Sequence, residues 1–252
     1  MSENRKYVLS IAGFDPSSGA GITADVKTFE QHNVFGLSVI TSNTIQNDSE
    51  FTKVYWIQPE IIFEQIEILF KKYFIEFVKI GLIENIDFLE RIVVKLKEYN
   101  SDIKIIWDPI LKATAGKEFH NGFEKNKLQN IFNSVYLITP NLDEFKILFP
   151  DVTNPENELP KILKELNINL LLKGGHSETE EIVDTLFFDS NIFKFKGTKF
   201  KNYSKHGTGC VLSSAIVSGL ANGLTLDKAC ENAKTYVENF IKSSKTNLGF
   251  HH

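Results

Sequence analysis

The chain has 252 residues, of which 42% are hydrophobic and 24% charged, and its net charge is −4. These values are typical of a soluble globular protein with a sizeable core. Because the charge is weakly acidic and the lysines form no basic block, the composition argues against nucleic acid or an anionic membrane surface as the main partner.

The sequence also argues against a membrane or secreted protein. No apolar run approaches the length of a membrane span, and the polar first residues lead into a strand pattern rather than a signal-peptide core. The two cysteines, Cys210 and Cys230, make neither a disulfide framework nor a metal-ligand cluster. We therefore expect a protein of the reducing cytoplasm.

Strand-like apolar runs alternate with amphipathic runs along nearly the whole chain. In chain order, the patterns predict strands at Tyr7–Ala12, Leu37–Ile40, Phe77–Ile80, Ile103–Trp107, Val135–Thr139 and Leu170–Lys173, then a hairpin of Ile182–Phe188 and Ile192–Lys196. They predict helices at Ile22–His32, Pro59–Phe70, Ile86–Tyr99, Asn141 to about Phe149, Leu159–Leu166, and from Gly207 and about Leu226 onward. The alternation indicates one α/β domain over residues 1–252, with a mainly parallel central sheet flanked by helices.

A Gly-rich loop, Gly13 to Gly21, follows the first strand. Within it, Gly19 begins a G-x-G-x-x-G/A pattern, which in dinucleotide-binding proteins needs its first glycine at the strand end. Six residues separate the first strand from Gly19, so a nicotinamide-dependent oxidoreductase is a disfavoured alternative. Asp25 follows in the next helix, where an acid near the helix start is also common without any function.

Polar residues follow the other predicted strands, where ligands of parallel sheets bind. Gln46 could pair with a heterocycle or simply be solvated. Asp108 ends the fourth strand, where a carboxylate suits Mg²⁺ or a phosphate cluster. Asn141 and Glu144 fit either such a site or a helix cap with a capping box. Lys173, before two glycines, could reach a phosphate or mark a simple turn.

The segment His206 to Cys210 places two glycines where a loop turns into a helix. The first N–H groups of a helix lack intrahelical partners, and the helix dipole adds positive charge, so the site suits a phosphate. An ordinary Gly-rich helix start fits this segment equally well. Together, however, a lysine, acids, an amide and this helix start supply what phosphoryl transfer needs. No Walker A pattern is present, which excludes a P-loop enzyme.

With these residues the chain resembles the hydroxymethylpyrimidine/phosphomethylpyrimidine kinases of thiamine biosynthesis, which have a ribokinase-like fold. The resemblance covers most of the chain. It rests on IAGFDPSSGAGITADVKTF, the QN pair at Gln46, KIG at Lys79–Gly81, DP at Asp108, TPNLDE at Thr139–Glu144, KGGH at Lys173–His176 and HGTGC at His206–Cys210. Several motifs in the right order make it far more specific than one glycine pattern.

The resemblance implies ATP- and Mg²⁺-dependent phosphorylation of 4-amino-5-hydroxymethyl-2-methylpyrimidine and then of its monophosphate, by a cytoplasmic homodimer. Asp25 and Gln46 would hydrogen-bond the aminopyrimidine, in a pocket lined by Gly13 and Leu82. The residues implied for ATP and its metal are Asp108 and Glu144 at the metal, Asn141, Lys173 and Thr208 at ATP, and the amides of Gly207, Thr208, Gly209 and Cys210 as an anion hole.

Two positions qualify this transfer of roles. Cys210 stands where most sugar kinases of this fold have an aspartate base; at a helix start it could supply a thiolate base or merely pack near the substrate. Lys112 stands where relatives have an apolar residue, so it alters the pocket wall or adds a cation for the substrate phosphate. Alternatives are a pyridoxal kinase of the same fold and a vitamin-binding protein without catalysis.

Overall fold

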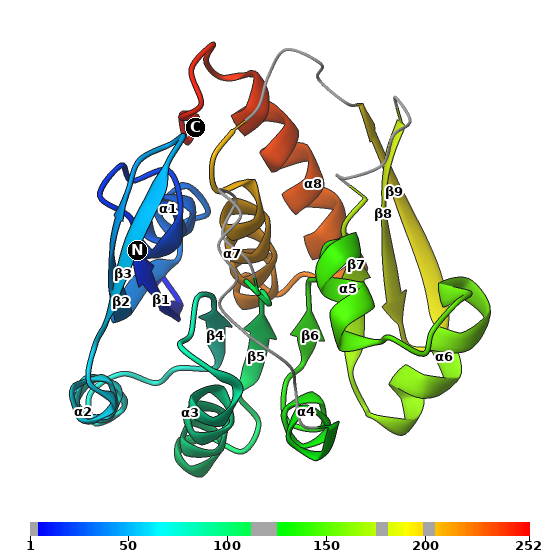
Figure 1. Ribbon diagram of the computed structural model, residues 1–252, viewed down its shortest axis with the longest axis horizontal. Coiled ribbons are helices and arrows are strands. Elements are labelled where there is room, and N and C mark those ends of the chain that lie inside the picture. The colour runs from blue at the N-terminus through cyan, green and yellow to red at the C-terminus, as the bar shows by residue number, and fades with distance from the viewer. Residues whose placement is uncertain (1–4, 112–124, 175–180, 199–204) are drawn as a thin grey trace.

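A nine-stranded sheet organises the computed structural model, which describes residues 5–111, 125–174, 181–198 and 205–252 (Figure 1). The strand order is β3-β2-β1-β4-β5-β6-β7-β8-β9. The strands are β1 (Tyr7–Phe14), β2 (Phe35–Gln46), β3 (Phe51–Trp56), β4 (Phe77–Ile80), β5 (Lys104–Trp107), β6 (Leu137–Ile138), β7 (Asn169–Leu172), β8 (Glu181–Phe188) and β9 (Asn191–Thr198). The helices are α1 (Gly21–Gln31), α2 (Pro59–Phe70), α3 (Ile86–Tyr99), α4 (Lys125–Phe132), α5 (Leu142–Leu148), α6 (Pro155–Glu165), α7 (Thr208–Ala221) and α8 (Leu226–Lys242).

The middle of the sheet is parallel and its edges are antiparallel. Strands β2, β1, β4, β5, β6 and β7 pair in parallel, whereas β3, β8 and β9 join through antiparallel pairs. The central strands are apolar on both faces, because helices cover both sides of the sheet. The carboxyl ends of the parallel strands therefore meet at one edge, where the candidate residues lie.

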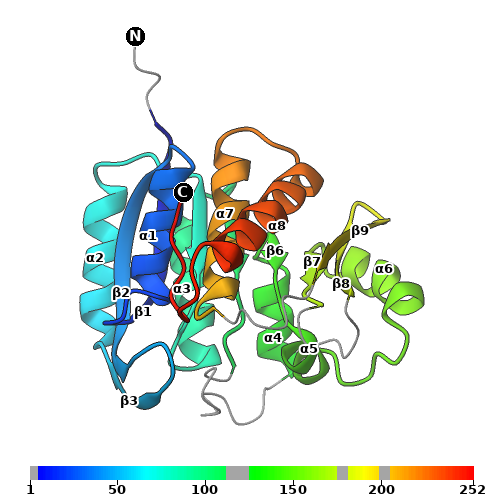
Figure 2. The same ribbon diagram turned by 90° about the horizontal axis from the view of Figure 1, so that it is seen from above.

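Helices form a layer on each side of this sheet (Figures 1 and 2). Helices α1, α7 and α8 lie on one side, and α2, α3 and α4 lie on the other. Two apolar clusters fill the spaces between the layers. Helix α7 is buried from Cys210 to Ala221, because its Ala, Ser and Gly residues let it lie close to the sheet. This confirms the predicted three-layer α/β sandwich.

The structure corrects two parts of the predicted order. Strand β2 does not end near Ile40 but continues to Gln46 and forms a hairpin with β3, which the sequence reading missed. The run Thr41–Gln46 looked like a loop, yet its residues from Ser42 to Gln46 pair antiparallel with β3. Helix α4 was also missed. Among the described residues, no helix is long and apolar enough to cross a membrane.

Candidate active site

The N-cap of helix α7 is Gly207, a position where any side chain would cause strain. Its φ is 77°, and a side chain there would overlap the carbonyl oxygen of Gly19. The two Gly-rich segments are therefore in direct backbone contact. The N–H groups of Thr208, Gly209 and Cys210 have no intrahelical acceptor and point out of the positive end of the helix. The predicted loop-to-helix turn is confirmed.

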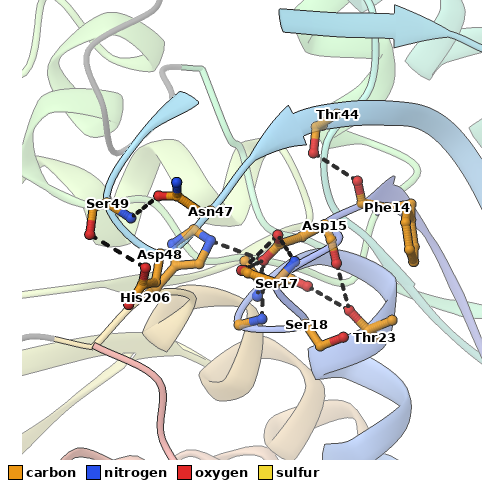
Figure 3. Close-up of polar contacts among 12 residues, drawn as sticks. Phe14, Asp15, Ser17, Ser18, Thr23, Thr44, Asn47, Asp48, Ser49 and His206 are labelled. Atoms are coloured by element: carbon orange, nitrogen blue, oxygen red, sulfur yellow. Dashed lines mark hydrogen bonds and ion pairs between the residues drawn. The ribbon is translucent and has the colours of Figure 1, made fainter. Parts of the chain in front are cut away.

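Asp15 organises the first Gly-rich loop and joins it to the second (Figure 3). Its carboxylate accepts the backbone N–H groups of Ser17, Gly19 and Ala20 at 2.8, 3.1 and 2.8 Å. His206 Nε2 lies 3.1 Å from Asp15 Oδ2. Burial alone would raise the pKa of Asp15, but the hydrogen bonds from His206, Ser17 and Ala20 outweigh burial and lower it. An ionised carboxylate thus holds both loops together.

Lys173 and Asp108 meet at the start of α7. Lys173 Nζ donates to Asp108 Oδ1 at 2.9 Å, and Thr139 Oγ1 donates to the same oxygen at 3.1 Å. A Cβ on Gly209 would lie 3.4 Å from Lys173 Nζ and 3.5 Å from Asp108 Oδ2. Burial would raise the pKa of Asp108, but the ammonium groups of Lys173 and Lys79 reverse this and lower it. A cation and an anion therefore face the free N–H groups.

Asn141 and Glu144 form the capping box of α5, as the structural alternative predicted. Asn141 Oδ1 accepts from the Glu144 N–H at 2.9 Å, and Glu144 Oε2 accepts from the Asn141 N–H at 2.8 Å. The same Glu144 oxygen lies 3.9 Å from Lys173 Nζ. Burial raises the pKa of Glu144 to about 7; Lys173 opposes this shift and Asp108 adds to it. The cap and the site thus share one carboxylate.

The carboxylates near Lys173 indicate which kind of metal ion the site could hold. In the described part of the chain, no three His, Cys, Asp or Glu side chains cluster as metal ligands. Among the described residues, the carboxylates of Asp108 and Glu144 lie 2.9 and 3.9 Å from Lys173 Nζ. Mg²⁺ typically takes one or two carboxylates and completes its shell with water and substrate phosphates. These two carboxylates fit that pattern, and would not fit a metal held by protein ligands alone.

The predicted pyrimidine pocket gathers around Gly13. A Cβ on Gly13 would lie 2.7 Å from Ser42 Oγ and 3.1 Å from Leu82 Cδ2, so these three residues are neighbours. Ser42 Oγ is buried and has no hydrogen-bond partner among the described residues. Gln46 is the last residue of β2 and is half-buried, and the pairing of β2 with β3 shifts register between Ile45 and Gln46.

Asp25 has different partners from those expected of a substrate ligand. Its Oδ1 accepts from Lys79 Nζ at 3.0 Å and from Ser214 Oγ at 2.8 Å. Its Oδ2 accepts from Lys79 Nζ at 2.8 Å and from Ser10 Oγ at 2.5 Å. The side chains of Asp25 and Lys79 have no exposed surface. A bond from Asp25 to an aminopyrimidine would therefore need one of these partners to be released.

The surroundings of Cys210 bear on its two possible roles, a thiolate base or a packing residue. Burial raises the pKa of its thiol to about 11, although Lys79 opposes the shift. Asp25 and Asp108 add to the shift. Of the two roles left open for Cys210 by the sequence, a raised thiol pKa favours the packing residue over the thiolate base.

Some site residues were not predicted from the sequence, and others lie outside the residues that the structure describes. Lys112 and His176 fall outside the described residues. Lys79 was quoted within a motif but not as the partner of Asp25, although a lysine inside the apolar strand β4 indicates a buried acid nearby. Asp15 gave no such signal, because its partners are mostly backbone N–H groups.

A parallel α/β sheet with a lysine, two carboxylates and free helix N–H groups at its strand ends defines a phosphotransferase without a P-loop. The comparisons give the particular family. The model of the phosphomethylpyrimidine kinase family matches residues 15–252, and the chain belongs to this family. The resemblance inferred from the motifs is thereby confirmed.

Curated relatives and solved structures agree with this assignment. A hydroxymethylpyrimidine/phosphomethylpyrimidine kinase of Aquifex aeolicus is 35% identical, over 94% of each chain. The phosphomethylpyrimidine kinase structure from Clostridium difficile is 31% identical, with a TM-score of 0.78, over 93% of this chain and 98% of that one. The pyridoxal kinase of Staphylococcus aureus, at 22% identity, shares the fold with a TM-score of 0.83, over 99% and 94% of the two chains. The ribokinase-like fold is confirmed.

Proposed function

We propose that this chain transfers the γ-phosphoryl group of ATP to 4-amino-5-hydroxymethyl-2-methylpyrimidine, and then to the resulting monophosphate. The observation that carries the proposal is the meeting of Lys173 and Asp108 with the free N–H groups of α7 at Gly209. Related structures hold nucleotides: the Staphylococcus aureus pyridoxal kinase was solved with ADP and with AMP-PCP. A cytoplasmic homodimer formed by one domain stays a prediction.

The chemistry assigns a part to each charged group. The N–H groups of Gly207 to Cys210 would stabilise the charge that develops on the transferred phosphoryl group. Lys173 would exchange its bond to Asp108 for a phosphate oxygen, with Thr208 and Asn141 beside it. Asp108 and Glu144 would hold Mg²⁺, which supplies neutralisation of phosphate charge when bound.

The pyrimidine would lie against Gly13 and Leu82. Gln46 would supply the amide that pairs with the ring, and Asp25 would sit behind the pocket with Lys79. If Cys210 is protonated, the rate enhancement comes from positioning and charge stabilisation rather than from base catalysis.

A substrate panel tests the proposal. Release of ADP is measured with hydroxymethylpyrimidine, its monophosphate and pyridoxal, and a Lys173→Met preparation serves as the blank for contaminating kinases. Turnover of both pyrimidines is expected. Turnover of pyridoxal alone would make the chain a pyridoxal kinase, and ligand binding with no turnover would make it a binding protein.

The Gln46→Ala variant tests the pocket. Losing a hydrogen bond to a buried polar ligand costs ~1–3 kcal/mol, so the KM for the pyrimidine should rise ~5- to 150-fold. The KM for ATP should stay nearly unchanged, because Lys173 and α7 are untouched. An unchanged pyrimidine KM would remove Gln46 from the site.

A further inference from the structure

The last ten residues of the chain fold back onto the candidate site. After α8 ends at Lys242, the chain turns towards the tip of the β2–β3 hairpin and then returns beside α1 (Figure 2). The backbone N–H of His206 donates to the carbonyl oxygen of Asn247 at 2.8 Å. Lys205 Nζ donates to the carbonyl oxygen of Ser244 at 2.7 Å and also to that of Thr246. Three hydrogen bonds thus dock residues 205–206 on residues 244–247.

The same segment contacts the other two parts of the site. A Cβ on Gly19 would lie 2.7 Å from Leu248 Cδ2 on one side and 2.7 Å from His206 Cδ2 on another, so Gly19 is enclosed by both residues. Asn247 Nδ2 donates to Ser49 Oγ, at the hairpin tip, at 3.3 Å. Residues Ser244–Leu248, here named the C-terminal clasp, therefore contact the first Gly-rich loop, the hairpin tip and the approach to α7.

The clasp is itself anchored to α8. Ser244 Oγ donates to the Leu248 carbonyl oxygen, which closes the clasp into a turn. The N–H of Phe250 donates to Ser243 Oγ at 2.7 Å. A Cβ on Gly249 would lie 2.5 Å from the ring of Phe240, so the backbone passes tightly over that helix. These contacts give the clasp a defined position on which residues 205–206 can rest.

The position of these contacts in the chain gives them a functional consequence. Lys205 and His206 directly precede Gly207, and Lys205 is a buried residue whose Nζ donates to the clasp carbonyls. Donors that stabilise a transition state act only if they are held in place before the reaction, and a shift of 1 Å can cost ~10²-fold in rate. The contacts of the clasp described above reach Gly19, Ser49, Lys205 and His206, so its effect on the N–H groups of α7 would pass through the residues that precede them.

We propose that the C-terminal clasp is a positioning element, which holds the start of α7 against the first Gly-rich loop in the geometry required for phosphoryl transfer. This inference rests on the proposed kinase function. Leu248 and Lys205 are positioning residues that act on the N–H groups of α7 without touching the substrate.

The test compares two variants of the clasp, and one variant of the tail that follows it, with wild type. Leu248→Ala removes the contact with Gly19, Leu248→Met keeps an apolar side chain of similar volume, and Phe250→Ala changes a residue that is 66% exposed in the same tail. The kcat of Leu248→Ala should fall ~10- to 100-fold, with KM values for ATP and pyrimidine within about twofold of wild type. Leu248→Met should restore most of kcat, and Phe250→Ala should match wild type.

Amide hydrogen exchange of residues 205–211 gives a readout that does not need activity. It should be faster in Leu248→Ala, and faster again in Lys205→Met, which keeps the aliphatic stem and loses only the ammonium. The proposal would be overturned if Leu248→Ala and Lys205→Met both fold and show unchanged exchange, or if both fold and keep an unchanged kcat. If wild type phosphorylates no pyrimidine, the proposed function fails, while the exchange rates still decide whether the clasp holds this loop.

Discussion

Two lysine–aspartate pairs lie under the strand ends of this protein, and they differ in what surrounds them. Lys79 and Asp25 have fully buried side chains, and Ser10 and Ser214 also donate to the carboxylate. Lys173 forms the second pair with Asp108 at 2.9 Å, but its side chain is 16% exposed and it faces the start of α7.

The difference in exposure indicates that the buried Lys79–Asp25 pair (the sealed pair) is structural and that the Lys173–Asp108 pair (the open pair) is available to a ligand. In the sealed pair, protein donors surround both carboxylate oxygens, so removing one partner would leave a buried charge without its counter-charge. In the open pair, the ammonium of Lys173 also lies 3.9 Å from Glu144 and can turn towards a phosphate. The burial of Lys79 opposes its charge, but Asp25 outweighs burial and raises the pKa of Lys79.

The largest effect should come from breaking the sealed pair. Lys79→Met leaves Asp25 buried without its counter-charge, which costs ~3–5 kcal/mol in the free energy of unfolding. Urea denaturation measures this loss. Adding Asp25→Asn should recover part of it, because the double variant buries no charge. A loss below ~1 kcal/mol in Lys79→Met would show that Asp25 tolerates burial without the ammonium of Lys79.

Breaking the open pair should change the rate rather than the stability. Lys173→Met removes a charged donor from the transferred phosphoryl group, and loss of one such donor costs ~10²–10³-fold in kcat. Its loss of unfolding free energy should be smaller than that of Lys79→Met. Steady-state ADP release and urea denaturation of both variants make the comparison. A normal kcat in Lys173→Met would contradict the assignment of the open pair.

The sequence predicted the open pair more fully than the sealed one. Asp108 and Lys173 follow apolar strands, and the strand-end rule alone brings them to one edge of the sheet. Asp25 and Lys79 are 54 residues apart, and their partnership depends on how α1 packs over β1, the neighbour of β4 in the sheet. A lysine within a strand indicates that a buried partner exists, but does not say which acid it is.

The extended hairpin and the clasp were hidden for different physical reasons. Strand β2 leaves the apolar core after Ile40, so its further residues are polar and resemble a loop. The clasp holds Lys205 through backbone carbonyl oxygens of Ser244 and Thr246, which any residue type could supply. No side-chain pattern in the sequence records such contacts.

A smaller effect should follow from Glu144→Gln, next to the open pair. Glutamine can keep the capping box with Asn141, so the melting temperature should change little. Loss of the carboxylate should raise the Mg²⁺ concentration for half-maximal rate several-fold. A Mg²⁺ titration of ADP release measures this. Earlier melting with normal kinetics at every Mg²⁺ concentration would leave Glu144 as a cap alone.

The same variant tests the raised pKa of Glu144 without metal or nucleotide. Burial raises this pKa from 4.5 to about 7, so the folded state keeps a proton that the unfolded state releases between these values. The resulting stabilisation is complete below pH 4.5 and is lost as the pH rises through 7. Relative to Glu144→Gln, the unfolding free energy of wild type should therefore fall across this range, and a flat difference would contradict the shift.

The smallest effect is expected at Cys210, which lies between the two pairs. Its pKa of about 11 reflects burial first, with Lys79 opposing and the two aspartates adding, so the neutral thiol is a poor base at pH 7. A general base is worth ~10²–10⁴-fold, and would matter most for the alcohol substrate. The monophosphate needs less help, because a phosphomonoester with a second pKa of ~6 is already mostly dianionic.

Cys210→Ala should therefore lower kcat by less than about threefold, equally on the alcohol and on the monophosphate, since base help of ~10²-fold or more is absent. Cys230→Ala is the matched control, because it removes the same atom from a buried site in α8. Both variants should lose ~1 kcal/mol or less of stability, as expected for a small cavity. Steady-state kinetics on both substrates decides the matter. A loss of ~100-fold confined to the alcohol would make Cys210 a base despite its burial. Cys210 would then belong with Lys173 and Asp108 to the groups that take part in the chemistry.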